Sequence, residues 1–71
     1  ISFSIFAEDT EPFEIELYDL NGRVVYTRTM SNIIIGDNKV EITLDGLSSG
    51  NYTLVIKQLS DMAVYNFIII K

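Results

Sequence analysis

Apolar and polar residues alternate along most of this chain in short runs, and turn-forming residues separate the runs. In residues 1–6, 13–18, 39–44 and 52–56, apolar side chains recur at every second position. This period of two places alternate side chains on opposite faces of a β-strand, and no run has the spacing of an amphipathic helix. The pattern therefore predicts an all-β protein whose antiparallel strands mostly have one buried and one solvated face.

The strongest local signal is the sequence DLNG at residues 19–22, which separates two runs of strand character. Two tight turns fit this sequence. One is a type I′ turn with Asn21 and Gly22 at its centre. The other is a type I turn that begins at Asp19 and leaves Gly22 left-handed in a bulge. Both turns predict a hairpin, but they differ in the register of its strands.

The cross-strand pairs distinguish the two turns. The type I′ turn places Ile15 opposite Arg28. The bulged turn gives the pairs Leu17 with Val25, Ile15 with Thr27, and Glu14 with Arg28. We predict the bulged turn, because it keeps the apolar face continuous and pairs opposite charges on the solvated face.

The middle of the chain contains a second turn signal. The sequence Gly36-Asp37-Asn38 predicts a turn before the strand in which Val40, Ile42 and Leu44 share one face. The three isoleucines at 33–35 form a short apolar run just before this turn, and we interpret them as a bridge between two sheets.

The last third of the chain predicts a loop and a long final strand. Residues 45–51 are rich in Gly, Ser, Asn and Asp, and the loop ends near Gly50. Leu47 is the one apolar residue in the middle of this loop, and we expect it to close one end of the core. The strand at 63–70 is apolar on both faces except at Asn66, so we expect it to be central in a sheet or covered by another element.

Taken together, the runs predict six to seven short strands. A single open sheet would leave large apolar faces in water, so two packed sheets are expected. We therefore predict that residues 1–71 form a single domain, a small antiparallel immunoglobulin-like β-sandwich.

Composition excludes the usual covalent and metal supports of a small domain. The chain has 71 residues, no Cys and no His, so it has neither a disulfide nor the usual ligands of a structural zinc. Apolar residues make up 48% of the chain, and core packing must therefore stabilise the fold. The first residue is Ile1 rather than Met, which we interpret as a processed or excised piece of a longer protein.

Charge and hydropathy narrow the range of partners. Ten acidic and five basic residues give a net charge of -5, which repels nucleic acid and anionic membrane surfaces. The longest apolar runs are far too short to cross a bilayer, so we expect no membrane insertion. A protein partner remains, and exposed strand edges favour strand addition with another chain, including a homodimer.

Candidate chemistry is sparse. Without His and Cys, the common general base and the thiolate nucleophile are missing. Glu14 and Glu16 share one strand face, which we interpret as a solvated face partly neutralised by Arg28 rather than as an acid/base pair. The acidic residues at positions 8, 9 and 11 lack the dense spacing of a calcium loop. We therefore predict no catalytic residue, no metal site and no cofactor, and we do not expect an enzyme.

Several motifs, in their order along the chain, carry a family resemblance. The segment IELYDLNGRVV at 15–25 is followed by GDN at 36–38, by LSSGNY at 47–52 and by a terminal apolar strand that ends in lysine at 67–71. This order resembles the C-terminal sorting domains that Bacteroidetes proteins carry for type IX (Por) secretion. The Pro-Asn-Pro opening of that family is absent here, and Tyr-Asn-Phe at 65–67 replaces its basic residues.

The resemblance implies a function. It implies a non-catalytic secretion-sorting module of an exported or cell-surface protein, which travels through the periplasm and is recognised by the type IX translocon through its surface and its last strand. The structural turn residues expected are Asp19, Asn21, Gly22 and Gly50. The expected recognition strand consists of Phe67, Ile68, Ile69, Ile70 and Lys71.

A second group is also similar. Small secreted immunoglobulin-like proteins of gut Bacteroidetes share a Val-Val-Tyr strand, a Gly-x-Tyr strand and a Phe-containing last strand, which match residues 24–26, 50–54 and 65–67. This resemblance implies the alternative function, a free-standing secreted binding protein whose ligand the sequence does not name.

Overall fold

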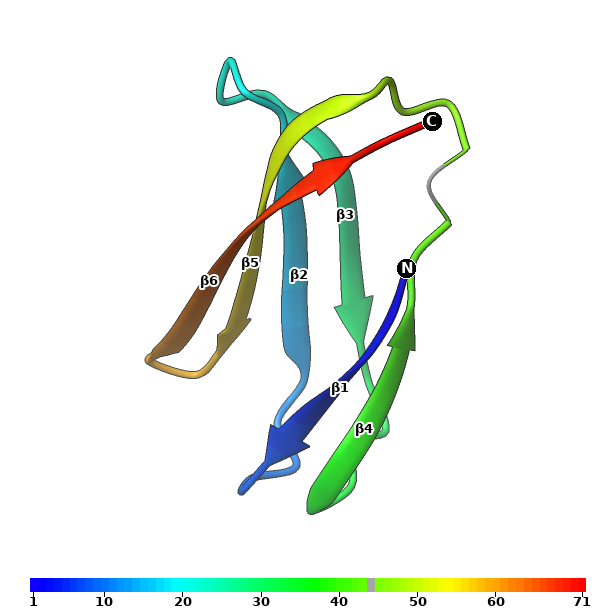
Figure 1. Cartoon of the computed structure of the whole chain (residues 1–71). Helices are drawn as coiled ribbons and strands as arrows, with labels where there is room; N and C mark the ends of the chain where they lie inside the picture. Colours follow the sequence, from blue (N-terminus) through cyan, green and yellow to red (C-terminus); the bar gives the residue numbers. More distant parts are fainter. Residues whose placement is uncertain (44) are drawn as a thin grey trace.

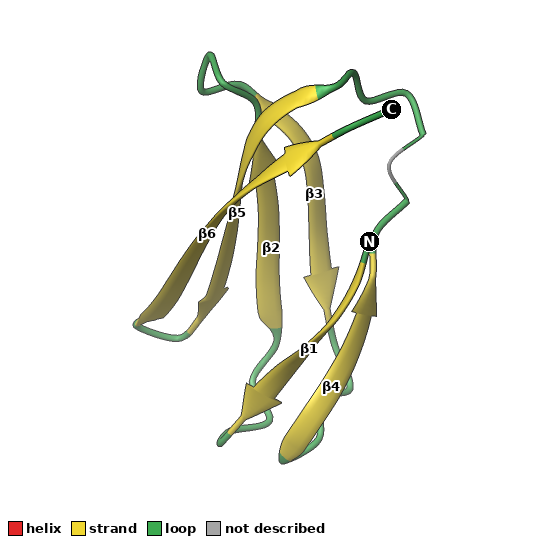
Figure 2. Cartoon of the chain, viewed as in Figure 1, coloured by secondary structure: helices red, strands yellow, loops and turns green. Residues whose placement is uncertain are grey.

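The computed structural model describes residues 1–43 and 45–71, and this part of the chain forms six β-strands and no helix (Figure 1, Figure 2). The strands are β1 (Ser2–Ala7), β2 (Phe13–Tyr18), β3 (Val24–Met30), β4 (Gly36–Glu41), β5 (Gly50–Gln58) and β6 (Asp61–Ile69). Every pairing between them is antiparallel. The prediction of a small antiparallel β-protein of the immunoglobulin-like sandwich class is therefore confirmed.

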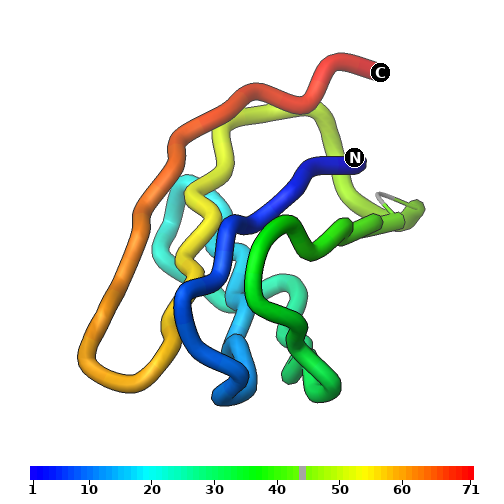
Figure 3. Tube along the Cα trace, turned by 90° about the horizontal axis from the view of Figure 1, so that it is seen from below, coloured from blue at the N-terminus to red at the C-terminus, as the bar shows by residue number. Residues whose placement is uncertain are grey.

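The strands form two sheets. β1 pairs with β4, and the other four strands follow the order β3-β2-β5-β6. Figure 3 shows that β4 and β6 lie on opposite sides of the molecule. Within the described residues, β1 and β6 each pair with one strand only, so each has one unpaired edge.

The core lies between the two sheets and follows the alternation of the sequence. Ile15 and Leu17 of β2 and Val40 of β4 are fully buried. Tyr52, Leu54 and Ile56 of β5 face the same core, and the residues between them are half-buried. The period of two therefore identified the inward faces of β2 and β5 correctly.

The Asp19 hairpin departs from the predicted register. Leu17 lies opposite Tyr26 and Ile15 lies opposite Arg28, so the predicted pairs of Leu17 with Val25, Ile15 with Thr27, and Glu14 with Arg28 are wrong. The reason is a second bulge: Tyr18 pairs with Val24, and the register then shifts by one residue, leaving Val25 without a partner in β2. A bulge of this kind adds local twist without changing the turn.

We predicted a turn at Gly36-Asp37-Asn38. This prediction is wrong, because these residues form the start of β4. The Asn38 side chain is buried and holds the preceding backbone. Its Nδ2 donates to the carbonyl oxygens of Ile34 at 2.9 Å and Gly36 at 3.1 Å, and its Oδ1 accepts from the Ile34 N–H at 3.0 Å. Asn38, a residue type that favours turns, therefore lies in a strand here, and its side chain holds the backbone of the residues before that strand.

The isoleucine run and the long loop close the sandwich at its ends. Ile33 is buried in the core, whereas Ile34 and Ile35 are both 61% exposed, so one isoleucine of the three enters the core between the sheets. Leu47 is half-buried against the core, as expected for a residue that closes one end. Leu44, which we expected on the buried face with Val40, lies outside the described residues.

Candidate functional site

The last strand lies at the edge of the four-stranded sheet. We expected a strand that is apolar on both faces to be central or covered, and the central position is wrong. The reason is topological: β6 follows β5 directly through a tight reversal at residues 59–60, and the other side of β5 is taken by β2. The expectation that another element covers β6 stays a prediction.

The predicted recognition strand at residues 67–71 covers the end of β6 and the two residues after it, because β6 ends at Ile69. It has an anchored side and an exposed side. Ile69 is 5% exposed and lies opposite Gly50, while Phe67 is half-buried and stacks on Tyr52 with ring centroids 6.1 Å apart. Ile68 and Ile70, in contrast, are 65% and 86% exposed. The fold therefore holds this apolar end of the chain in place through Phe67 and Ile69 and leaves Ile68 and Ile70 in contact with water.

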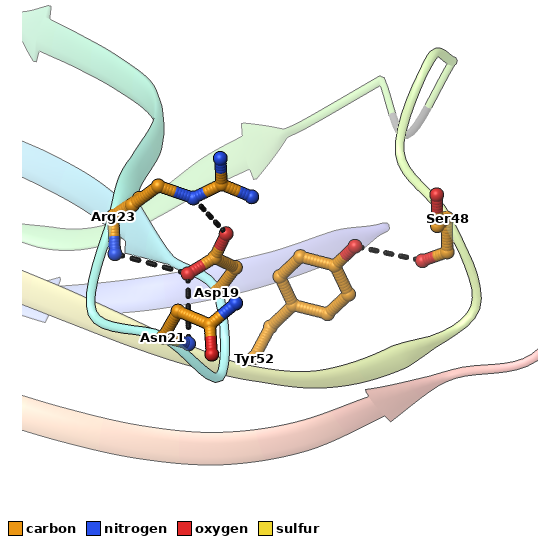
Figure 4. Close-up of polar contacts among 5 residues, drawn as sticks. All are labelled: Asp19, Asn21, Arg23, Ser48 and Tyr52. Atoms are coloured by element: carbon orange, nitrogen blue, oxygen red, sulfur yellow. Dashed lines mark hydrogen bonds and ion pairs between the residues drawn. The ribbon is translucent and has the colours of Figure 1, made fainter.

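The loop before β5 fixes the end of the recognition strand. The backbone N–H of Lys71 donates to Ser49 Oγ at 3.0 Å. Tyr52 Oη donates to the carbonyl oxygen of Ser48 at 2.7 Å, which ties the same loop to the core side of β5 (Figure 4). Gly50 starts β5 between these two contacts. The predicted residue Gly50 thus lies beside the recognition strand.

The predicted turn residues Asp19, Asn21 and Gly22 form one hydrogen-bonded unit. Figure 4 shows the Asp19 carboxylate with its contacts to Asn21 and Arg23. The Gly22 N–H donates to the Asp19 carbonyl oxygen at 3.0 Å, and Gly22 has a φ of 81°. Asn21 does not have the positive φ that a type I′ turn requires at that position, so the turn is of type I. Asp19 Oδ1 accepts from the backbone N–H groups of Asn21 and Arg23, each at 2.9 Å.

Electrostatics strengthen this turn. Arg23 Nε also donates to Asp19 Oδ2 at 2.9 Å. The backbone N–H of Arg23, helped by its guanidinium, lowers the pKa of the Asp19 carboxyl below its ordinary value. Because the folded-state pKa is the lower one, the carboxylate stabilises the turn above the unfolded-state pKa, and this contribution is lost as the pH falls through the lowered value. These contacts hold the turn together, and Asp19 also lines a surface hollow that Phe67 and Ile68 line as well.

Lys57, rather than Arg28, pairs with an acidic side chain on the outward face of β2. Lys57 Nζ lies 2.9 Å from Glu16 Oε1, and this hydrogen bond lowers the pKa of Glu16 and raises that of Lys57. We expected Arg28 to neutralise this face, but Arg28 donates to the carbonyl oxygen of Glu41 at 3.1 Å instead. The shifted register explains why Arg28 does not pair with a glutamate of β2. Arg28 lies opposite Ile15, and its side chain reaches Glu41 of β4 instead.

Metal binding and membrane crossing find no support within residues 1–43 and 45–71. No group of three or more acidic side chains in that part of the chain converges as metal ligands do. No helix there has the length and hydrophobicity that a membrane crossing requires.

Comparison with known proteins identifies one family. The model of a family described as the secretion system C-terminal sorting domain matches residues 1–71, the whole length of the chain. The search of the curated proteins found no match.

Proposed function

This chain belongs to the secretion system C-terminal sorting domain family, and from that premise we propose that the type IX translocon recognises it through the exposed end of β6. The chain is a secretion-sorting module, and it marks its protein for export through the periplasm to the cell surface or the medium. Domains of this family interact with the secretion machinery and are in general non-catalytic. We extend this to the present chain and propose that it is not an enzyme.

The proposal rests on one observation, the presentation of the recognition strand. Ile68 near the end of β6 and Ile70 just after it are exposed, whereas Phe67 and Ile69 are packed against the body of the domain. An edge strand of this kind offers unpaired backbone groups for strand addition and apolar side chains for a pocket. Both are available to a translocon component without unfolding of the sandwich.

Fusion to a reporter tests the sorting role. Residues 1–71 would be attached to the C-terminus of a periplasmic reporter in a host that has a type IX system. We expect the reporter on the cell surface or in the medium, and in the periplasm when the secretion system of the host is deleted. Retention in the periplasm of the intact host would contradict the sorting role and favour the alternative, a free-standing secreted binding protein.

We also propose weak self-association through the same end of β6. A second copy can add antiparallel to the unpaired edge near Ile68 and Ile70, where the strand carries no acidic residue. Sedimentation at rising concentration is expected to detect a dimer of residues 1–71, and the dimer should be lost when these two isoleucines become threonine. A strict monomer at high concentration would rule the dimer out.

We further propose that residues 1–71 form a single domain. Residues of both sheets contribute to one core, with Ala7 and Val40 from the β1–β4 pair and Ile15 and Leu54 from the four-stranded sheet. Neither sheet buries its apolar face without the other.

A further inference from the structure

A groove of about 620 Å³ lies between β1 and β6, at the opposite end of β6 from the recognition strand. Phe13 and Ile56, which belong to the core, form part of its lining, together with Ile5 of β1 and Ala63 of β6. The strands that border it come from different sheets, and each has an unpaired edge within the described residues. The groove is therefore a place where the sandwich does not close completely.

The shape and lining of the groove fit an extended segment. It follows β6 from Asp61 to Tyr65, a length of about 16 Å for a strand. Ala63 and Tyr65 lie opposite Ile56 and Leu54 of β5, so they share the inward face of the sheet. Tyr65 is nevertheless 56% exposed. A bound strand with apolar side chains at alternate positions would cover this face.

One end of the groove is acidic. Glu8, Asp9 and Asp61 line it, and no Lys or Arg does. Gln58 holds the segment that carries Glu8 and Asp9 close to Asp61. Gln58 lies opposite Asp61 in the β5–β6 hairpin, and its Nε2 donates to the carbonyl oxygen of Asp9 at 3.0 Å. Gln58 Nε2 also donates to the carbonyl oxygen of Glu11 at 2.7 Å.

Within residues 1–43 and 45–71, these acids form no ion pair with a basic side chain. The ion pairs among the described residues join Arg23 to Asp19, Lys39 to Glu41, and Lys57 to Glu16. The acids of the groove take part in none of them. A second copy of the chain would bring a further net charge of -5 to this end, so the charge favours a basic occupant over self-association here.

We propose that this groove binds an extended polypeptide segment of a partner protein, with apolar side chains at alternate positions and basic residues at the end beside Glu8, Asp9 and Asp61. The apolar side chains cover the inward face of β6, and the backbone of the segment pairs with the free edge of β6 or β1. This site uses the first half of β6, so it is independent of the recognition strand at residues 67–71.

A peptide titration tests the proposal. The probe is a blocked peptide of about seven residues that alternates Val and Thr and ends in two Lys, and the matched control ends in two Glu. NMR spectra of ¹⁵N-labelled residues 1–71 are expected to shift at residues 4–6 and 61–65. The Lys peptide should bind about tenfold more tightly than the Glu peptide, and the difference should shrink at about 1 M salt.

Charge variants locate the basic end. Asp9→Asn with Asp61→Asn should weaken binding of the Lys peptide about fivefold, since each substitution removes one charge and preserves side-chain shape. Glu41→Gln with Asp45→Asn makes the same change of net charge at residues that do not line the groove and should leave binding unchanged. Both variants should leave export of a fused reporter intact, so failure here is distinguishable from failure of the sorting role.

Any of four results with added peptide would overturn the proposal. These are no binding of the Lys peptide, equal binding of the Lys and Glu peptides, shifts confined to residues 67–71, and equal effects of the two charge variants. Shifts at residues 61–65 that grow with protein concentration in the absence of peptide would assign the groove to a second copy, and would also overturn it.

Discussion

The double substitution Ile68→Thr with Ile70→Thr is expected to reduce export of a reporter fused to residues 1–71 by about tenfold or more. Threonine keeps the branched shape that strands favour, so the strand should persist. Each isoleucine would contribute about 1.5–3 kcal/mol if a partner buried its side chain, and about 1.4 kcal/mol corresponds to a factor of ten in affinity. The measurement is the fraction of reporter outside the cell, compared with the unmodified fusion.

The same face of β6 provides the control. Met62 and Val64 lie toward the other end of the strand and are 63% and 52% exposed, so Met62→Thr with Val64→Thr removes a similar amount of exposed apolar surface. We expect this variant to be exported normally, and both variants to unfold at the same urea concentration as the unmodified chain. Equal loss of export in the two variants would mean that the machinery does not distinguish the end of β6 from its beginning.

The inward faces of the strands could be predicted because burial on one face imposes a period of two. In β2 the alternation of Phe13, Ile15 and Leu17 with glutamate reproduces the observed pattern of burial. The turn at Asp19 was predictable for a related reason: its side chain accepts the hydrogen bonds of the same tight segment, so every interaction needed lies within a few residues.

The sequence pattern failed where distant segments decide the structure. The alternation along β6 reports that both of its faces are apolar, but not which strand lies beside it, and the β5–β6 hairpin places it at the edge. The acidic end of the groove likewise depends on Gln58, which reaches across to the carbonyl oxygen of Asp9. No local pattern marks that glutamine, and only the fold brings the two segments together.

The hydrogen bonds from the Asn38 side chain to the backbone of Ile34 and Gly36 form what we call the Asn38 clamp. It shows most clearly that a sequence typical of a turn can have a different role in the fold. A Gly-Asp-Asn sequence favours turns, yet here Asn38 lies in β4 opposite Ile5 and its amide holds the chain around Ile34. Asn38 is the buried polar side chain among the described residues, and such a group is stable in a core only when it is hydrogen-bonded. Its position inside a predicted turn concealed this role.

Asn38→Ala should therefore destabilise the domain by about 2–3 kcal/mol, because it leaves the N–H and C=O of Ile34 and the C=O of Gly36 without their side-chain partner. For a domain of this size that corresponds to a fall in melting temperature of about 10–20 °C. Unfolding by urea, followed by circular dichroism, measures the effect, and the unmodified chain is expected to unfold in one cooperative transition. Asn51→Ala is the matched control, since Asn51 is exposed, and equal stability of the two variants would show that the clamp does not stabilise the fold.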